Sequence, residues 1–145
     1  IAIIGCRKAS SYGKKVAYEF AYQLAKKGII IISGLARGID SYAHLGAVKA
    51  RGKTIAVLGS GFNHIYPAEH KGLCTEILKN GGSIITEYPP ETKPIPTNFP
   101  SRNRIISGLS NGVLVVEAKE KSGTLITVDY ALDQGKEVFI IPRKY

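Results

Sequence analysis

The sequence lacks methionine and tryptophan, and it contains only two cysteines, Cys6 and Cys74, among 145 residues. These cysteines lie far apart without metal-ligand spacing, which favours free thiols in a reducing compartment and predicts a cytoplasmic protein. No apolar run approaches the ~20 residues of a membrane-spanning helix, so no membrane association is expected. A strand-like run starts at residue 1 without an initiator methionine, which predicts a domain excised from a longer chain.

Acidic residues are also scarce. Eleven Asp and Glu stand against twenty Lys and Arg, so that the net charge is +9 and the isoelectric point is near 9.6. Such a surplus predicts a polyanionic partner, with nucleic acid first, and a generally basic surface is the alternative. The apolar content of 44% and the 16 glycines favour a single α/β domain over residues 1–145, large enough for a real core.

Several enzyme signatures are missing. The first expected strand ends in Gly5-Cys6-Arg7-Lys8 instead of G-x-G-x-x-G, which argues against a dinucleotide dehydrogenase. The chain has neither a G-x-x-x-x-G-K-[ST] loop nor a G-x-S-x-G elbow. Asp40 and His44 lie one helical turn apart, which favours a local pair or a cap for the preceding turn over a catalytic triad. His64 and His70 have no metal-ligand spacing. We therefore predict no metal, no cofactor and no enzymatic activity.

Short apolar runs alternate with helical segments along the whole chain. Strands are expected at residues 1–4, 29–32, 54–58, 83–86, 113–116 and 137–141. The first helix is expected to begin near Ser10 and to turn Val16, Phe20 and Leu24 inward. Uniformly apolar strands separated by helices predict an extended Rossmann-like fold, α/β and doubly wound, with a mainly parallel sheet in a three-layer α/β/α arrangement.

The segment 29–44 is the centre of this pattern. An isoleucine run is followed by a small-residue turn, 33–38, and by a helix that carries Asp40 and His44. We expect backbone N–H groups of this turn to point outward and to bind an anion at the helix N-terminus, with Gly34 allowing close approach. Arg37 would add a guanidinium group. The alternative is an ordinary strand–helix connection with a solvated arginine.

A proline-rich loop is expected at residues 88–100, where five of the seven prolines gather, and its length suggests function. It leads into Arg102 and Arg104. Phe99 is placed to stack on an unpaired base, or else to anchor the loop in the core. Arg104 is placed to contact phosphate, or else to form a salt bridge with Glu87 or Glu117.

Ligands of doubly wound folds gather at the carboxyl ends of the strands, where the strand order reverses. Several basic turns of this chain meet at that edge, which predicts phosphate or nucleic-acid binding. No duplex-reading motif is present, so single strands are the favoured target. The side chains assigned to this task from the residues alone are Arg7, Arg37, Arg102 and Arg104 for phosphates, Ser33, Ser101 and Ser122 as hydroxyl donors, and Phe99 for a base.

Four segments in this order resemble the DNA-processing protein A family, DprA or Smf: IAIIGCRKASSYG, IISGLARGIDSYAH, TIAVLGSGFNHIYP and FPSRNRIISGLSNGVLVVEAKEKSGTLIT. The resemblance runs from Ile1 to Pro142. It implies an extended Rossmann domain that binds single-stranded DNA without strong sequence preference. It also implies protection of incoming DNA in natural transformation, loading of the RecA recombinase, a homodimer of the full-length protein, and no established catalytic activity.

The DNA pocket implied by the resemblance comprises Gly5, Cys6, Arg7, Ser33, Gly34, Phe99, Arg102, Asn103, Arg104, Ser122 and Gly123, to which the residue argument adds Arg37. Some members carry a lysine just before the FPSRNR run. This chain has Pro94-Ile95-Pro96 there, so that Lys93 is the nearest replacement. The family also continues past the last strand into a segment of dimer and recombinase contacts.

A second resemblance points to an enzyme. Cytokinin-activating phosphoribohydrolases are similar Rossmann-like proteins with a PGGxGTxxE motif, whose glutamate assists departure of the base. The corresponding stretch here is residues 121–127, which keeps Gly123-Thr124 but has Thr127 in place of the glutamate. A phosphoribohydrolase-like activity on nucleoside monophosphates, or simple nucleotide binding, therefore stays as the alternative to DNA binding.

Overall fold

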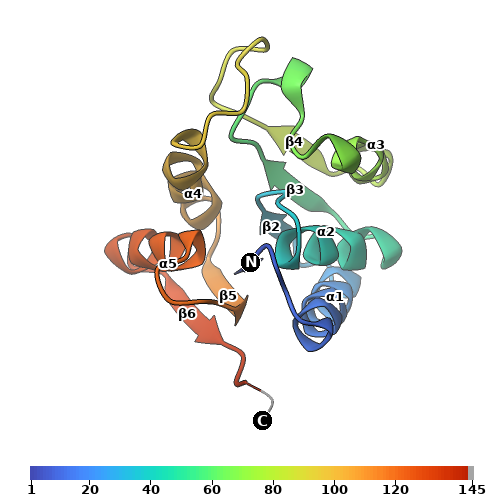
Figure 1. Ribbon diagram of the computed structural model, residues 1–145. Coiled ribbons are helices and arrows are strands. Elements are labelled where there is room, and N and C mark those ends of the chain that lie inside the picture. The colour runs from blue at the N-terminus through green and yellow to red at the C-terminus, as the bar shows by residue number, and fades with distance from the viewer. Residues whose placement is uncertain (144–145) are drawn as a thin grey trace.

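The computed structural model describes residues 1–143, which form one six-stranded sheet in the order β4-β3-β2-β1-β5-β6. All neighbouring strands run parallel, so the expected doubly wound fold is confirmed (Figure 1). The strands are β1 (Ala2–Gly5), β2 (Ile31–Ser33), β3 (Thr54–Val57), β4 (Ser83–Ile85), β5 (Gly112–Glu117) and β6 (Glu137–Ile140).

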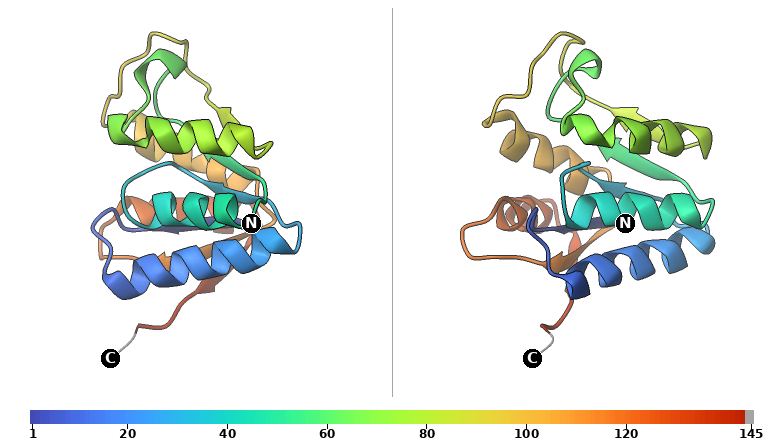
Figure 2. Two further views of the ribbon diagram at one scale, coloured as in Figure 1. Left: turned by 90° about the vertical axis from the view of Figure 1, so that its right-hand side faces the viewer. Right: turned by 45° about the vertical axis from the view of Figure 1, so that its right-hand side comes forward.

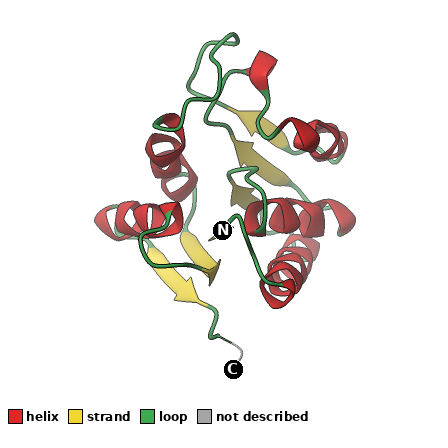
Figure 3. Ribbon diagram, in the orientation of Figure 1, coloured by secondary structure: helices red, strands yellow, loops and turns green. Residues whose placement is uncertain are grey.

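Helices cover both faces of the sheet in three layers (Figures 1 and 3). One face carries α1 (Ser11–Lys26), α2 (Ile39–Lys49) and α3 (Lys71–Lys79), and the other carries α4 (Asn98–Gly108) and α5 (Gly123–Asp133). Two 3₁₀ turns, η1 (Phe62–His64) and η2 (Ala68–His70), precede α3. None of the helices in residues 1–143 is both long and apolar enough to cross a membrane.

The inward face of α1 differs from the expected one. Small residues are buried there at intervals of four, namely Gly13, Ala17, Ala21 and Ala25. Phe20 is 44% exposed, and Val16 and Leu24 pack only at the edge of the core. The reason lies in α2, because a Cβ atom at Gly46 would come within 2.3 Å of the Tyr18 carbonyl oxygen. Two helices this close leave room only for small side chains between them.

Two element boundaries are also corrected. The expected strand at 29–32 begins only at Ile31, and Ile29 and Ile30 are 37% and 42% exposed. Gly28 and Ile29 instead form the C-terminal cap of α1, because Gly28 adopts φ +83° and the Ile29 N–H donates to the Leu24 carbonyl. Likewise α4 begins at Asn98 rather than at Ser101, so that Phe99 lies in the first turn of a helix and not in the loop.

The strand order reverses at one position of the sheet, between β1 and β5. The chain moves outward from β1 through β2 and β3 to β4 and then returns to add β5 and β6 on the other side of β1. The turns that follow β1 and β5 therefore diverge to opposite faces of the sheet. This divergence opens a crevice outside the carboxyl ends of these two strands.

We predict that the close packing of α1 on α2 makes Gly46→Ala destabilising. The new methyl group meets the Tyr18 carbonyl oxygen at 2.3 Å and Ala21 at 3.1 Å, so the helices must separate. We expect the free energy of unfolding to fall by about 1–3 kcal/mol, measured by urea denaturation.

The matched control is Gly72→Ala in α3, where a Cβ atom meets nothing within 4 Å. This substitution keeps the helical backbone and is expected to raise the free energy of unfolding by roughly 0.5–1 kcal/mol. Equal effects of the two substitutions would show that the contact between α1 and α2 is looser than described.

Candidate functional site

A cleft of about 550 Å³ opens at the carboxyl ends of β1 and β5. It is walled by the turn after β1, the turn after β2, and the first turns of α4 and α5. The structure brings most of the expected residues together here, namely Gly5, Cys6, Arg7, Gly34, Arg37, Phe99, Arg102, Asn103, Ser122 and Gly123. Ser33 and Arg104 are not among the described residues that line it.

The turn after β2 is held by side chains of α2. The Gly34 N–H donates to Asp40 Oδ2 at 3.0 Å, and the Leu35 N–H donates to His44 Nε2 at 3.3 Å. The Ser33 hydroxyl donates to the Ile3 carbonyl at 2.6 Å. The sequence argument expected these groups to face a ligand, whereas in the structure each of them already donates to a partner inside the protein. The alternative role of Asp40 and His44, capping the turn, is confirmed.

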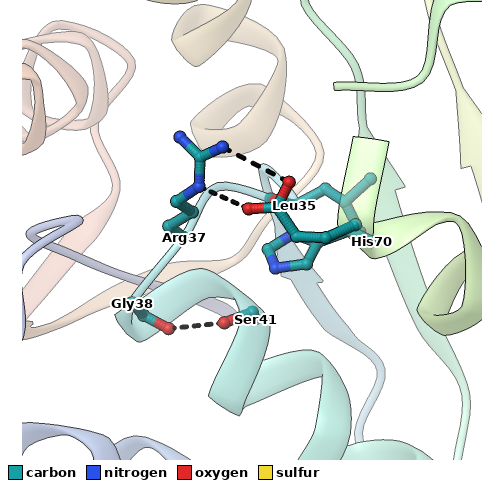
Figure 4. Close-up of polar contacts among 6 residues, drawn as sticks. Leu35, Arg37, Gly38, Ser41 and His70 are labelled. Carbon is teal, nitrogen blue, oxygen red and sulfur yellow. Dashed lines mark hydrogen bonds and ion pairs between the residues drawn. The ribbon is translucent and has the colours of Figure 1, made fainter. Parts of the chain in front are cut away.

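Leu35 shows how firmly this turn is fixed. Its backbone has φ +60°, a conformation that is unfavourable for a branched side chain. The side chain is fully buried, and His70 Nδ1 donates to the Leu35 carbonyl at 2.7 Å (Figure 4). In the next turn the Ser41 hydroxyl donates to the Gly38 carbonyl at 2.8 Å (Figure 4). Contacts from several elements therefore impose the conformation of the turn.

His44 is a structural histidine. The Thr54 hydroxyl donates to the Ile31 carbonyl at 2.7 Å, so it accepts from His44 Nδ1 at 2.8 Å, and this fixes the tautomer with the proton on Nδ1. Burial lowers the pKa of His44 to about 3, and the nearby His70 and Arg102 act in the same direction. A neutral ring whose two nitrogens are both engaged is unsuited to act as a catalytic base.

Arg102 lies beneath the cleft rather than on it. The side chain is 4% exposed, and Nη1 donates to the Gly34 carbonyl at 2.9 Å and to the Val57 carbonyl at 2.6 Å. Nε donates to Asn103 Oδ1 at 3.1 Å. Hydrogen bonds within residues 1–143 thus engage Nε and Nη1. Burial lowers the pKa of Arg102, and Asp40 opposes this effect.

Two other arginines of the expected set form ion pairs. Arg37 Nε lies 2.5 Å from Glu69 Oε1, and its guanidinium group covers the Tyr66 ring at 5.7 Å. Arg104 pairs with Glu87, as the salt-bridge alternative predicted. Both arginine side chains are about half exposed, so their pairs are of the solvent-screened kind that contributes little to stability. Arg7 is exposed at the rim.

Phe99 is anchored against the protein. Its ring centroid lies 5.5 Å from that of Tyr66 and beneath the guanidinium group of Arg102. A Cβ atom at Gly59 would come within 2.7 Å of the ring, so only glycine fits there. The anchor interpretation of Phe99 is therefore confirmed, although the half-buried ring still lines the cleft.

The start of α5 lines the cleft. Ser122 occupies the N-cap position, but its hydroxyl makes no capping bond, and this oxygen is buried without a hydrogen-bond partner among the described residues. A Cβ atom at Gly123 would meet nothing within 4 Å. The Asn103 side chain donates to the Gly123 carbonyl at 3.3 Å and so fixes α5 to α4. A helix N-terminus with an unused hydroxyl favours an anionic ligand.

Sequence reasoning missed Asp40 and Tyr66 as cleft residues. Asp40 is 6% exposed, and burial raises its pKa to about 6 although Arg102 and the Gly34 N–H oppose the shift. The floor of the cleft therefore carries one buried cation and one buried acid, while the rim is basic. Among residues 1–143, no group of three His, Cys, Asp or Glu residues is arranged to hold a metal ion.

Comparisons with known proteins agree with one another. The family model described as DNA recombination-mediator protein A matches residues 1–145. DNA processing protein DprA of Bacillus subtilis is 51% identical over 142 residues, which cover 98% of this chain and 48% of that protein. The chain spans half or less of the length of the curated relatives with the highest identity.

Two solved structures show the same fold. DprA of Streptococcus pneumoniae has a TM-score of 0.88 at 42% identity, covering 99% of this chain and 50% of that one. DNA processing protein A of Helicobacter pylori, known for its single-stranded DNA binding mode, has a TM-score of 0.90 at 34% identity, covering 99% of this chain and 65% of that one.

Asp40 predicts a distinct dependence of stability on pH. Its pKa is raised from 3.8 to about 6 in the folded protein, so the fold favours the protonated form. The stability that Asp40 contributes is therefore complete below pH ~4 and is lost as the pH rises through about 6. Asp40→Asn keeps an acceptor for the Gly34 N–H without the charge. Its free energy of unfolding should match that of the wild type near pH 4 and exceed it by about 3 kcal/mol near pH 7.

Urea denaturation across this pH range measures the difference between the two proteins. Asp129→Asn, at an exposed position of α5, serves as the control for loss of one carboxylate. A pH-independent difference for Asp40→Asn would contradict the raised pKa of the buried Asp40 carboxyl group.

Proposed function

Since the chain belongs to the DNA recombination-mediator protein A family of DprA and Smf proteins, we propose that its cleft binds single-stranded DNA. The observation that carries the proposal is a cleft of about 550 Å³ whose lining includes both the N-terminus of α5 and the exposed Arg7. The single-stranded DNA binding mode of the Helicobacter pylori relative supports the same ligand.

Each wall of the cleft would have a separate task. Phosphates would lie between Arg7, Arg102 and the first turn of α5 with Ser122. Arg37, and next to the cleft Arg104, would exchange their carboxylate partners for phosphate, which costs little because those pairs are half exposed. Phe99 would offer its remaining surface to a base. Bases would be bound by stacking rather than by edge recognition, which accounts for weak sequence preference.

Within the full-length protein we propose a role in presenting single-stranded DNA to the RecA recombinase. The description of the family as a recombination mediator supports this role, and so does its place in DNA processing. Protection of incoming DNA during natural transformation, and action as a homodimer in the cytoplasm, belong to the same proposal. They concern the whole protein, of which this chain corresponds to about half.

A nucleotide is the second candidate ligand. The volume of the cleft falls within the range of small-molecule sites, and a helix N-terminus suits a single phosphate group. Hydrolysis of such a ligand has no support in the geometry. Thr127 occupies the position of the required glutamate, and its hydroxyl lies 3.5 Å from the Gly123 carbonyl. Competition by thymidine monophosphate distinguishes a nucleotide site from a DNA site.

We predict that Arg7→Ala weakens binding of single-stranded DNA about tenfold and leaves the fold unchanged, since Arg7 is exposed. Fluorescence anisotropy with labelled oligo(dT), over roughly 50 to 200 mM salt, measures the affinity. The slope of its logarithm against the logarithm of salt should fall by about 0.7, because one phosphate contact is lost.

Arg51→Ala is the matched control, because it removes the same charge from the turn between α2 and β3 at the opposite edge of the sheet. Duplex DNA of equal length is the second control. If Arg7→Ala and Arg51→Ala weaken binding equally, or if duplex and single strand bind with equal affinity, the protein attracts DNA only through its overall positive charge, and the proposed cleft is contradicted. Arg102→Ala is a poor test, because it strands the buried carbonyls of Gly34 and Val57.

A further inference from the structure

The positive charge of the cleft is smaller than the sequence suggests. Arg37 and Arg104 are neutralised by Glu69 and Glu87, and Arg102 is buried above Asp40. The net charge of +9 must therefore reside largely elsewhere on the molecule. Lysines on and around α1 account for part of it. Helix α1 contains Lys14, Lys15 and Lys26 but only one acid, Glu19.

Lys14 and Lys15 line a groove between α1 and α2, and Lys26 lies farther along α1. The groove has a volume of about 470 Å³, and its lining consists of Ser11, Lys14, Lys15 and Tyr18 from α1 with Tyr42 and Leu45 from α2. None of the ion pairs among residues 1–143 includes a lysine of α1. The charge of the groove is therefore not cancelled by a carboxylate of the same molecule.

Aromatic rings alternate with these cations. Lys14, Tyr18, Tyr22 and Lys26 follow one another at intervals of four residues, which places them on one ridge of α1. The rings of Tyr18 and Tyr22 are stacked, with centroids 6.2 Å apart and planes inclined by 19°. The Lys14 ammonium lies 5.7 Å from the centre of the Tyr42 ring, and that of Lys26 lies 5.6 Å from the Tyr22 ring. The ridge is about 18 Å long, enough for about five stacked nucleotides.

The groove begins close in sequence to the turn after β1, which lines the cleft. Helix α1 begins at Ser11, and the Ser10 hydroxyl donates to Glu117 at the end of β5, which lies beside the turn that carries Arg7. The two helices lie side by side with their N-terminal ends at the same edge of the molecule (Figure 2, left). A strand that leaves the cleft over Arg7 and Lys8 therefore meets the start of the groove.

We propose that the groove between α1 and α2 is a second binding segment for single-stranded DNA, occupied by the part of the strand that emerges from the cleft. Its bases stack on Tyr18 and Tyr22, and its phosphates lie over Lys14, Lys15 and Lys26. Tyr18 and Tyr22 are partly exposed, and accessible aromatic rings interleaved with cations bind single strands without regard to sequence. This inference rests on the function proposed above and adds the path of the strand beyond the cleft.

The test compares two lengths of labelled oligo(dT), about 6 nucleotides to fill the cleft and about 20 to reach the groove. Lys14→Gln combined with Lys15→Gln should weaken binding of the long strand about fivefold to tenfold and lower its salt slope by roughly 1.4. Binding of the short strand should stay unchanged. Lys71→Gln combined with Lys79→Gln, on the exposed side of α3, removes equal charge elsewhere and should leave both affinities nearly unchanged.

A second pair of variants tests stacking. Tyr22→Ala should weaken binding of the long strand about tenfold, whereas Tyr22→Phe keeps the ring and should bind as the wild type does. Photocrosslinking of a 5-iodouracil-containing strand, followed by peptide mapping, should place the adducts of a distal base on residues of α1.

Three results would overturn the inference: equal effects of the α1 and α3 lysine pairs, equal loss for short and long strands, or adducts confined to the cleft. If the wild type binds neither strand, the proposed function fails and this inference fails with it. If the short strand is bound and is sensitive to Arg7→Ala while the α1 variants bind the long strand normally, the inference alone fails.

Discussion

The cleft depends on how Gly34 is held from two sides. Its N–H donates to Asp40 on α2, and its carbonyl accepts from Arg102 on α4. The two helices lie on opposite faces of the sheet, so this single residue ties both helical layers to the end of β2. Only glycine fits, because a Cβ atom would lie 2.8 Å from Asp40 Oδ2 and 3.0 Å from Arg102. Burying two opposite charges costs desolvation, which their mutual attraction and four hydrogen bonds offset.

This arrangement moves the anion-binding end of the site. The chain contains two strand–helix turns of the right composition, but the N–H groups after β2 are used to hold the turn itself. At the N-terminus of α5, Gly123 is unobstructed, and the buried Ser122 hydroxyl has no partner among the described residues. The turn after β2 is thus rigid scaffold, and in the proposed function the ligand would lie at the α5 side of the cleft.

The sequence was sufficient for the topology and for the edge of the sheet at which the cleft lies. Two local signals predict the elements, namely uniformly apolar strands such as 113–116 and glycines at the ends of elements. The reversal of strand order follows from the alternation of strands and helices. The sequence did not show whether an individual side chain is buried, paired or exposed. Arg102 and Arg104 are two residues apart in one motif, yet one is buried against carbonyls and the other lies at the surface beside Glu87. That difference arises from the direction in which α4 meets the sheet, which no local pattern encodes.

The same limit explains the two faces of α1. Phe20 was expected inside because of its size, but the distance between α1 and α2 is set by Gly46 against the backbone of Tyr18. Small residues therefore fill the interior, and the larger rings of α1 are displaced toward the rim and the surface. Tyr18 and Tyr22 stack there beside lysines instead of entering the core. Tight packing inside thus creates the basic and aromatic ridge outside, so the sequence features that close the core also supply the surface along which a single strand would run.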